Sequence, residues 1–294
     1  MRERTAAVYS AAVHTARRSV ESGSSAHAEK DIRYHDIIAA QYDRVVVEPR
    51  WASINALFRP MSRALPAQRR LMLDVGTGTG HMLRRFARLF AAVVAVDHSE
   101  AMLDVTCATT RRLGLSNVDF VAANADDFLA REQRQFDLIT CVGFLHHLQP
   151  SSLVRLLSLA RSRLAPGGVL ILSEPILTAV AEPRAIEWWN RIYRRRPELY
   201  DETPEDPDEA PLELPALKAA LASASLRIAA EGRGWELSAQ RRARRRRCDR
   251  NRDPAPDLRQ HGPGLLGGVP RGVSQRTPVS LRAITSRWIS LVPS

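Results

Sequence analysis

The sequence predicts an α/β fold in which buried strands alternate with helices. Two observations support this prediction. The apolar run at residues 71–73 leads through Asp74 into a glycine-rich turn, and a helix-period pattern begins at His81. Further short apolar runs follow along the chain, each bounded by turn or helix-start residues. With 294 residues, the chain is long enough to bury a large core.

The glycine-rich turn predicts a ligand site. Gly76, Gly78 and Gly80 have no Cβ, so a ligand can approach the backbone closely at the end of the first strand. A dinucleotide fingerprint reads G-x-G-x-x-G and receives a pyrophosphate, whereas this turn reads G-x-G-x-G after Asp74. A carboxylate there would repel a phosphate but suit a cationic amine. S-adenosylmethionine carries an amine and a sulfonium and no phosphate. The alternative is a glycine-rich loop without a ligand.

The second and third strands end in polar residues that suit a nucleoside. Residues 93–97 form a buried strand ending at Asp97, about 20 residues after the glycines, where a ribose-binding carboxylate is expected. Asp97 can alternatively cap the helix that follows it. The third strand, 118–122, precedes Asn124 and Ala125, whose side-chain oxygen and backbone N–H suit the adenine amine and a ring nitrogen.

At this point the sequence resembles the class I S-adenosylmethionine-dependent methyltransferases. The resemblance covers residues 32 to about 236 and includes the predicted fourth and fifth strands. The stretch 143–148, Gly-Phe-Leu-His-His-Leu, resembles the subgroup that methylates small molecules, which includes quinone-biosynthesis enzymes (methyltransferase types 11 and 25). The motifs that match in family order are residues 73–80, 94–97, 124–125, 136–139 and 164–170.

The resemblance implies a doubly wound, Rossmann-like and mainly parallel sheet, with helices on both faces and a final antiparallel strand. It implies S-adenosyl-L-methionine as cofactor, with the methionine end at the glycine turn, the ribose at Asp97 and the adenine between Asn124 and Ala125. The family often has Asp where Asn124 stands, and Asn keeps the acceptor oxygen. The residues expected at the cofactor are Asp74, Gly76, Thr77, Gly78, Gly80, Asp97, His98, Asn124, Ala125 and Cys141.

Methyl transfer needs alignment of acceptor and sulfonium, and a general base when the acceptor is a hydroxyl or an acidic carbon. His146 and His147 follow the fourth strand, where the family places its acceptor, and are the catalytic candidates. Alternatively one of them packs against the next helix, since adjacent side chains are expected to face different ways. Glu174, after the fifth strand, is a second candidate acid. No metal is expected, because relatives that bind one use carboxylates where this chain has Gly143 and His146.

Two segments are expected to select the acceptor. The helix predicted over residues 33–43 contains Tyr42, which either covers the cofactor or packs the helix onto the body. A later aromatic stretch either walls an apolar pocket or belongs to ordinary core. The candidate wall residues are Phe144, Trp188, Trp189, Ile192 and Tyr193.

Three regions are predicted: an N-terminal extension (1–31, partly disordered), the methyltransferase domain (32–238), and an Arg/Pro-rich tail (239–294). The tail has thirteen Arg, no Lys and three Asp, so it holds ten of the eleven net positive charges. It is interpreted as a frameshift product, an ordinary disordered tail or a nucleic-acid-binding arm. The first strand of the closing hairpin is present at residues 226–231. The strand pattern of its partner starts before residue 237, but the sequence then becomes arginine-rich and the pattern ends. The hairpin is therefore expected to be incomplete.

These observations favour a cytoplasmic enzyme that transfers a methyl group from S-adenosylmethionine to oxygen, nitrogen or carbon of a small, partly apolar metabolite. Three cysteines form no disulfide framework, and no apolar run approaches the ~18 residues of a membrane span or resembles a signal peptide. The near-neutral body makes nucleic acid an unfavoured partner. The alternatives are an RNA or protein methyltransferase guided by the tail, and a catalytically inactive methyltransferase fold.

Overall fold

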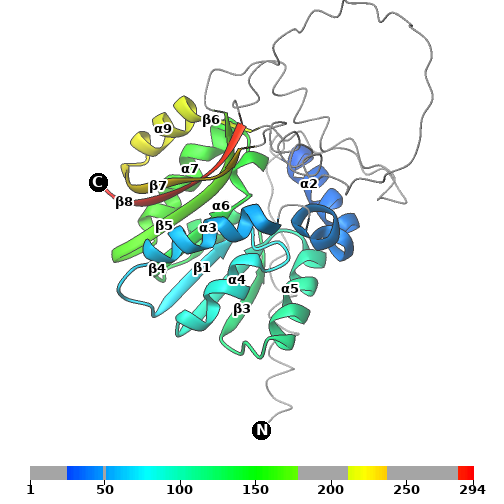
Figure 1. Ribbon diagram of the computed structural model, residues 1–294. Coiled ribbons are helices and arrows are strands. Elements are labelled where there is room, and N and C mark those ends of the chain that lie inside the picture. The colour runs from blue at the N-terminus through cyan, green and yellow to red at the C-terminus, as the bar shows by residue number, and fades with distance from the viewer. Residues whose placement is uncertain (1–24, 49–50, 178–210, 237–283) are drawn as a thin grey trace, which may run out of the picture.

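The structure, a computed structural model, describes residues 25–48, 51–177, 211–236 and 284–294. A central open sheet has the strand order β3-β2-β1-β4-β5-β8-β7, with the short β6 beside β5 (Figure 1). The strands are β1 Leu71–Val75, β2 Ala92–Asp97, β3 Val118–Ala122, β4 Phe136–Val142, β5 Leu164–Leu177, β6 Leu212–Glu213, β7 Leu226–Glu236 and β8 Ile284–Pro293. The parallel strands β1 to β5 confirm the predicted doubly wound α/β fold, and their carboxyl ends meet at one edge.

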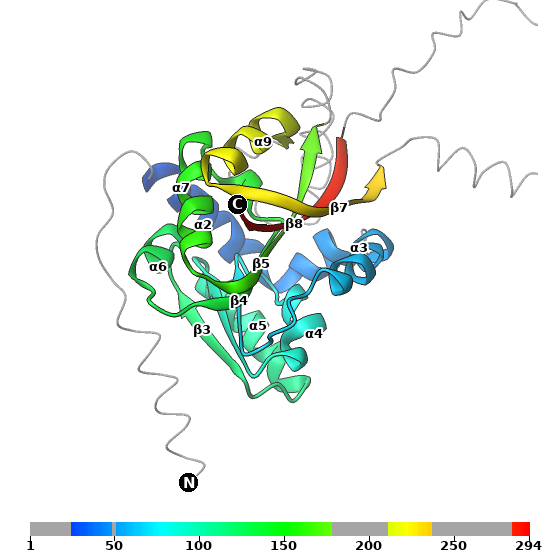
Figure 2. The same cartoon turned by 90° about the vertical axis from the view of Figure 1, so that its left-hand side faces the viewer.

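Helices cover both faces of this sheet (Figure 2). The helices are α2 Ser25–Ile38, α3 Trp51–Arg63, α4 His81–Phe86, α5 Glu100–Arg112, α6 Ala125–Arg131, α7 Pro150–Ser162 and α9 Leu214–Ser223. Side chains alternate along β1, so Met72 packs with α3 and α4 on one face, whereas Leu73 packs in the other core cluster with α6, α7 and α9. Each face therefore has its own apolar core.

The closing antiparallel hairpin is complete. β8 lies between β5 and β7 and pairs antiparallel with both of them. Its side chains alternate between the two faces, so Leu291 joins one core and is 0% exposed, while Trp288 packs into the other. The predictions that the hairpin is incomplete and that the whole tail lies outside the fold are therefore wrong for residues 284–293. The arginine-rich stretch that prompted them, up to residue 283, lies outside the described residues.

The N-terminal boundary also needs correction. Helix α2 begins at Ser25, so it crosses the boundary predicted between the extension and the domain at residue 31. It packs on α5 through Tyr34 and Ile38, which form a small cluster with Met102. Tyr42 follows α2 and packs against the same cluster, as the packing alternative predicts. The chain then continues through the short helical turns η1 (Ala39–Gln41) and η2 (Asp43–Val47).

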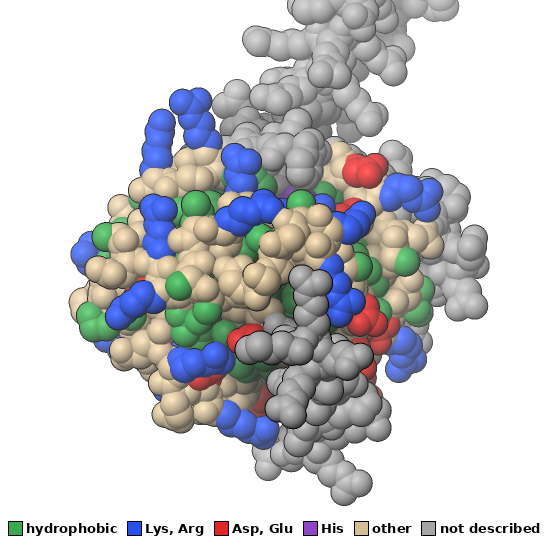
Figure 3. All heavy atoms as spheres, turned by 90° about the horizontal axis from the view of Figure 1, so that it is seen from below, with side chains coloured by type: hydrophobic (Ala, Val, Ile, Leu, Met, Phe, Trp, Pro, Cys, Tyr) green, Lys and Arg blue, Asp and Glu red, His purple; other side chains and the backbone are tan. Residues whose placement is uncertain are grey.

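Charged side chains are distributed over the face of the molecule seen in Figure 3. Lys and Arg side chains stand apart from one another there, with Asp and Glu among them. This distribution fits the near-neutral charge expected of the body. Among the described residues, none of the helices combines the length and the apolar character that crossing a bilayer requires.

Candidate active site

The glycine turn lies where β1 ends and α4 begins. Gly76, Gly78 and Gly80 all have positive φ, at 65°, 53° and 81°, a region that favours glycine. A Cβ on Gly76 would lie 2.5 Å from the Phe144 ring, so this glycine is required by packing. A Cβ on Gly78 would meet no atom within 4 Å. The backbone at Gly78 therefore faces open space, which is available to a ligand.

Asp97 connects the turn to the next strand end. Its Oδ2 accepts a hydrogen bond from the Gly78 N–H at 2.8 Å, and its Oδ1 accepts one from the Ser99 N–H at 3.0 Å. The cap of α5 is Ser99, whose hydroxyl accepts from the Met102 N–H, so the alternative that Asp97 is the cap is wrong. Carboxylate oxygens have further lone pairs, and Asp97 therefore retains acceptor capacity for a diol.

Asp74 lies beneath the turn and not on its open side. It is buried, and its two oxygens accept hydrogen bonds from the hydroxyls of Thr77 at 2.7 Å and Thr140 at 2.6 Å. Burial raises the pKa of Asp74 to about 6, against the opposing effect of the two hydroxyls. The side chains of Asp74 and Thr77 thus bind each other and join the turn to β4. The expected place of Asp74 at the methionine end, and of Thr77 among the cofactor-binding residues, stays a prediction.

The adenine-side candidates lie at the start of α6. Asn124 is exposed and caps this helix, because its Oδ1 accepts a hydrogen bond from the Asp126 N–H at 2.9 Å. Ala125 is the first residue of α6, where backbone N–H groups have no acceptor within the helix. Cys141 differs from its prediction, since its side chain is buried in the core between β1, β4 and the neighbouring helices. Burial, followed by the negative charges of Glu174 and Asp74, raises the pKa of the Cys141 thiol.

The two adjacent histidines have different partners. Nδ1 of His146 lies 2.8 Å from Oε2 of the buried Glu174 on β5. Nδ1 of His147 lies 3.0 Å from Oδ1 of Asp31 on α2. The two ring centroids are 4.2 Å apart, yet the rings bind partners on different elements. His146 is tied into the body of the fold, while His147 faces the helix above the sheet edge.

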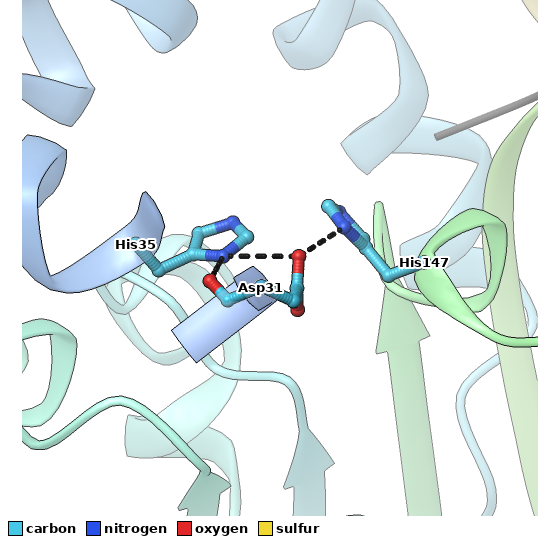
Figure 4. Close-up of side chains that lie close together, drawn as sticks. All are labelled: Asp31, His35 and His147. Atoms are coloured by element: carbon cyan, nitrogen blue, oxygen red, sulfur yellow. Dashed lines mark hydrogen bonds and ion pairs between the residues drawn. The ribbon is translucent and has the colours of Figure 1, made fainter. Parts of the chain in front are cut away.

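Asp31 is the centre of a cluster of three imidazoles, and Figure 4 shows two of them, those of His35 and His147. The Asp31 carboxylate, which contacts His147, also lies 3.4 Å from Nδ1 of His35 and 3.1 Å from Nε2 of His98. Burial alone would raise the pKa of Asp31, but the charge of His147 and the hydrogen bonds of all three imidazoles outweigh burial and hold it well below its usual range. Burial alone would lower the pKa of His35. The hydrogen bonds and the charge of Asp31 outweigh burial, and the pKa of His35 is raised.

Three further contacts hold the N-terminal segment on the same edge of the sheet. The Ser99 hydroxyl donates to Asp36 of α2 at 2.6 Å. Asp43 accepts from the Thr79 hydroxyl and from the Arg84 guanidinium, each at 2.5 Å. The segment therefore touches the glycine turn, the β2 end and the loop after β4, where a cofactor and an acceptor would meet.

Sequence reasoning missed Asp31 and His35. Their i, i+4 spacing places both side chains on one face of a helix. Two histidines meet that face: His98, which directly follows β2, and His147, in the loop after β4. The i, i+4 pair was readable in the sequence, whereas its meeting with His98 and His147 was not. The predicted wall residues Trp188, Trp189, Ile192 and Tyr193 lie outside the described residues.

The topology, the glycine turn and the acid after β2 together define the class: the chain carries a class I S-adenosylmethionine-dependent methyltransferase domain. Residues 72–168 match the family model described as "Methyltransferase domain". This match runs from β1 to the first residues of β5 and so includes the glycine turn and the ends of β2, β3 and β4.

The comparisons add particular relatives. The ubiquinone biosynthesis O-methyltransferase of Xanthomonas axonopodis pv. citri is 33% identical over 137 residues, which are 46% of this chain and 55% of the relative. The chain spans little more than half the length of such curated relatives. The [4+2]-cyclase SpnF has a similar structure, with a TM-score of 0.59, 15% identity and coverage of 94% and 99% of the two chains. A DhpI-SAM-HEP complex has a TM-score of 0.53 and 22% identity, covering 74% and 95%.

Proposed function

We propose that this protein transfers the methyl group of S-adenosylmethionine to a hydroxyl of a small, partly apolar molecule. The observation that carries the proposal is the pairing of His147, in the loop after β4, with Asp31 of α2, which also contacts His98 at the end of β2. Relatives named as O-methyltransferases support an oxygen acceptor. The near-neutral body favours a metabolite over nucleic acid as the partner.

S-adenosylmethionine fits the residues that line the edge. The open backbone at Gly78 leaves room for the cofactor, and Asp97 offers lone pairs to the ribose hydroxyls. Asn124 and the N–H of Ala125 lie at the start of α6 on the adenine side. Asp74 acts indirectly, because its two hydroxyl partners fix the shape of the turn.

The chemistry assigned to His147 is general base catalysis. Because Nδ1 of His147 faces the Asp31 carboxylate, Nδ1 carries the proton and donates to it. Nε2 is then the unprotonated ring nitrogen. The acceptor oxygen attacks the methyl carbon, the carbon–sulfur bond breaks, and sulfur keeps the electron pair as a thioether. The acceptor proton passes to Nε2, and Asp31 stabilises the imidazolium that forms.

Turnover on a panel of hydroxylated aromatic metabolites tests this proposal. His147→Ala and Asp31→Asn should lower kcat by about 10²–10⁴, the range for losing a general base. The cofactor Kd, measured by calorimetry, should change little in His147→Ala. Asp36→Ala is the control, because it removes a different contact of α2, the acceptor of the Ser99 hydroxyl, without touching His147. Methylation of RNA alone, or kcat values unaffected by either substitution, would refute the proposal.

A further inference from the structure

The cluster around Asp31 has the composition and spacing of a metal site. Asp31, His35 and His147 each offer one ligand atom, and these three atoms lie within 4.8 Å of one another. Imidazole nitrogens combined with one carboxylate oxygen suit zinc and related divalent transition ions better than magnesium or calcium. We propose that Asp31, His35 and His147 bind a divalent transition-metal ion of the zinc type and leave one coordination position for water.

The distances support this ligand set. Oδ1 of Asp31 lies 3.0 Å from Nδ1 of His147 and 3.4 Å from Nδ1 of His35. Tetrahedral zinc with bonds of about 2.0–2.2 Å separates its ligand atoms by about 3.3–3.5 Å. The cluster therefore needs only small shifts to surround an ion. Nε2 of His98 approaches the other carboxylate oxygen of Asp31, Oδ2, at 3.1 Å and so lies outside the three-atom group.

Burial favours an ion as well. Asp31 is 4% exposed, and the side chains of His35 and His147 are 12% and 10% exposed. In the structure, protons on the imidazoles satisfy the carboxylate, and Nδ1 of His35 also lies 2.8 Å from the Asp31 carbonyl oxygen. A divalent ion replaces these protons with direct bonds from the same nitrogens. The exchange needs no new side chain and no movement of the sheet.

An ion at this place would have two effects. It would join α2 to the loop after β4, because Asp31 and His35 come from the helix and His147 from the loop. It would also take the lone pair of Nδ1 in His147 and leave the ring proton on Nε2, so that His147 could not act as a base. The ion-bound form and the base-active form are thus alternative states of one cluster. This goes beyond the proposed function, and the binding itself does not depend on that function.

The test uses the untagged full-length chain, stripped with chelator and titrated with Co²⁺ without cofactor or acceptor. We expect one Co²⁺ per chain, the intense visible absorption of a tetrahedral ion, and displacement by Zn²⁺. Asp31→Asn, His35→Gln and His147→Gln should each weaken binding at least about 10–100-fold, the loss that even outer partners of a metal site cause. His81→Gln, a histidine of α4 outside the cluster, should bind Co²⁺ like the wild type.

Far-UV circular dichroism checks that each variant folds. In case the ligand variants unfold, imidazole ¹⁵N NMR of the wild-type protein provides a second measurement. Zn²⁺ should shift the Nδ1 signals of His35 and His147 and leave those of His81 in place. Binding of equal strength in His35→Gln, or unchanged Nδ1 signals at saturating Zn²⁺, would overturn the proposal. Because no methyl transfer is measured, these outcomes are separate from failure of the proposed function.

Discussion

Glu174 on β5 holds the loop that carries His146. Its Oε2 lies 2.8 Å from Nδ1 of His146, and its Oε1 accepts hydrogen bonds from the backbone N–H groups of Phe144 and Leu145, both at 2.9 Å. One buried carboxylate thus fixes the loop after β4, and this loop sets the position of His147. The candidate acid predicted at this strand end acts as a scaffold for the loop.

Glu174→Ala should therefore lower the free energy of unfolding by about 2–4 kcal/mol, because it leaves buried N–H donors without an acceptor. Glu174→Gln retains one carbonyl oxygen and should lose clearly less. Urea unfolding of the two variants provides the measurement. Equal stability of Glu174→Ala and the wild-type protein would show that water replaces the carboxylate without cost.

Gly78→Val should abolish binding of S-adenosylmethionine by filling the space that the turn leaves open. The matched control is Gly114→Val, since Gly114 also has a positive φ, 64°, and no atom within 4 Å of a built Cβ. Both substitutions strain the backbone, so both should lower the melting temperature. Calorimetry should show that Gly114→Val binds the cofactor and Gly78→Val does not. Normal cofactor binding by Gly78→Val would contradict a cofactor site at this turn.

Asp74 should make stability depend on pH. Its folded-state pKa of about 6 lies above the ordinary value of 3.8, so its contribution is complete below about pH 4 and is lost as the pH rises through 6. Asp74→Asn removes this titration. The stability of the variant relative to the wild-type protein should therefore rise by about 1–3 kcal/mol between pH 4 and pH 7. Urea unfolding of both proteins across this range measures the difference, and a constant difference would argue against a buried, protonated Asp74.

Leu291→Ala should lower the free energy of unfolding by about 2–5 kcal/mol, because Leu291 on β8 belongs to the core. Ser294→Ala, at an exposed position just beyond β8, is the control and should have little effect. Truncation after residue 283 should destabilise the protein more than either, since it leaves β5 and β7 without their shared partner. Thermal unfolding of the three variants tests this, and a stable truncated protein would show that β8 is dispensable.

Much of the fold was predictable because it depends on local patterns. Each parallel strand is a short apolar run between turn residues, and the glycine turn has a spacing that few other structures need. Strand β8 was missed although its residues alternate, with Trp288 and Leu291 on opposite faces. The arginine-rich sequence before it dominated the composition of the tail and concealed a ten-residue strand.

The parts of the candidate site that lie close together in the sequence were predictable. The parts that distant segments bring together were not. Gly78 and Asp97 lie near each other in the chain and were placed correctly at the same edge. The contact between Asp31 and His147 spans 116 residues, and no local pattern fixes such a distance. The burial of Asp74 is also a tertiary effect, since it depends on Thr140 of the neighbouring strand.

The position of β8 has a consequence for the order in which the protein forms during synthesis. β7 lies outside β8 in the sheet, yet it precedes β8 in the chain, with residues 237–283 between them. Until β8 leaves the ribosome, β5 presents an open edge that β7 cannot fill in its native place. An open edge accepts the same strand from a neighbouring chain equally well. Where nascent chains are crowded, two copies would therefore exchange β8 and form a domain-swapped dimer.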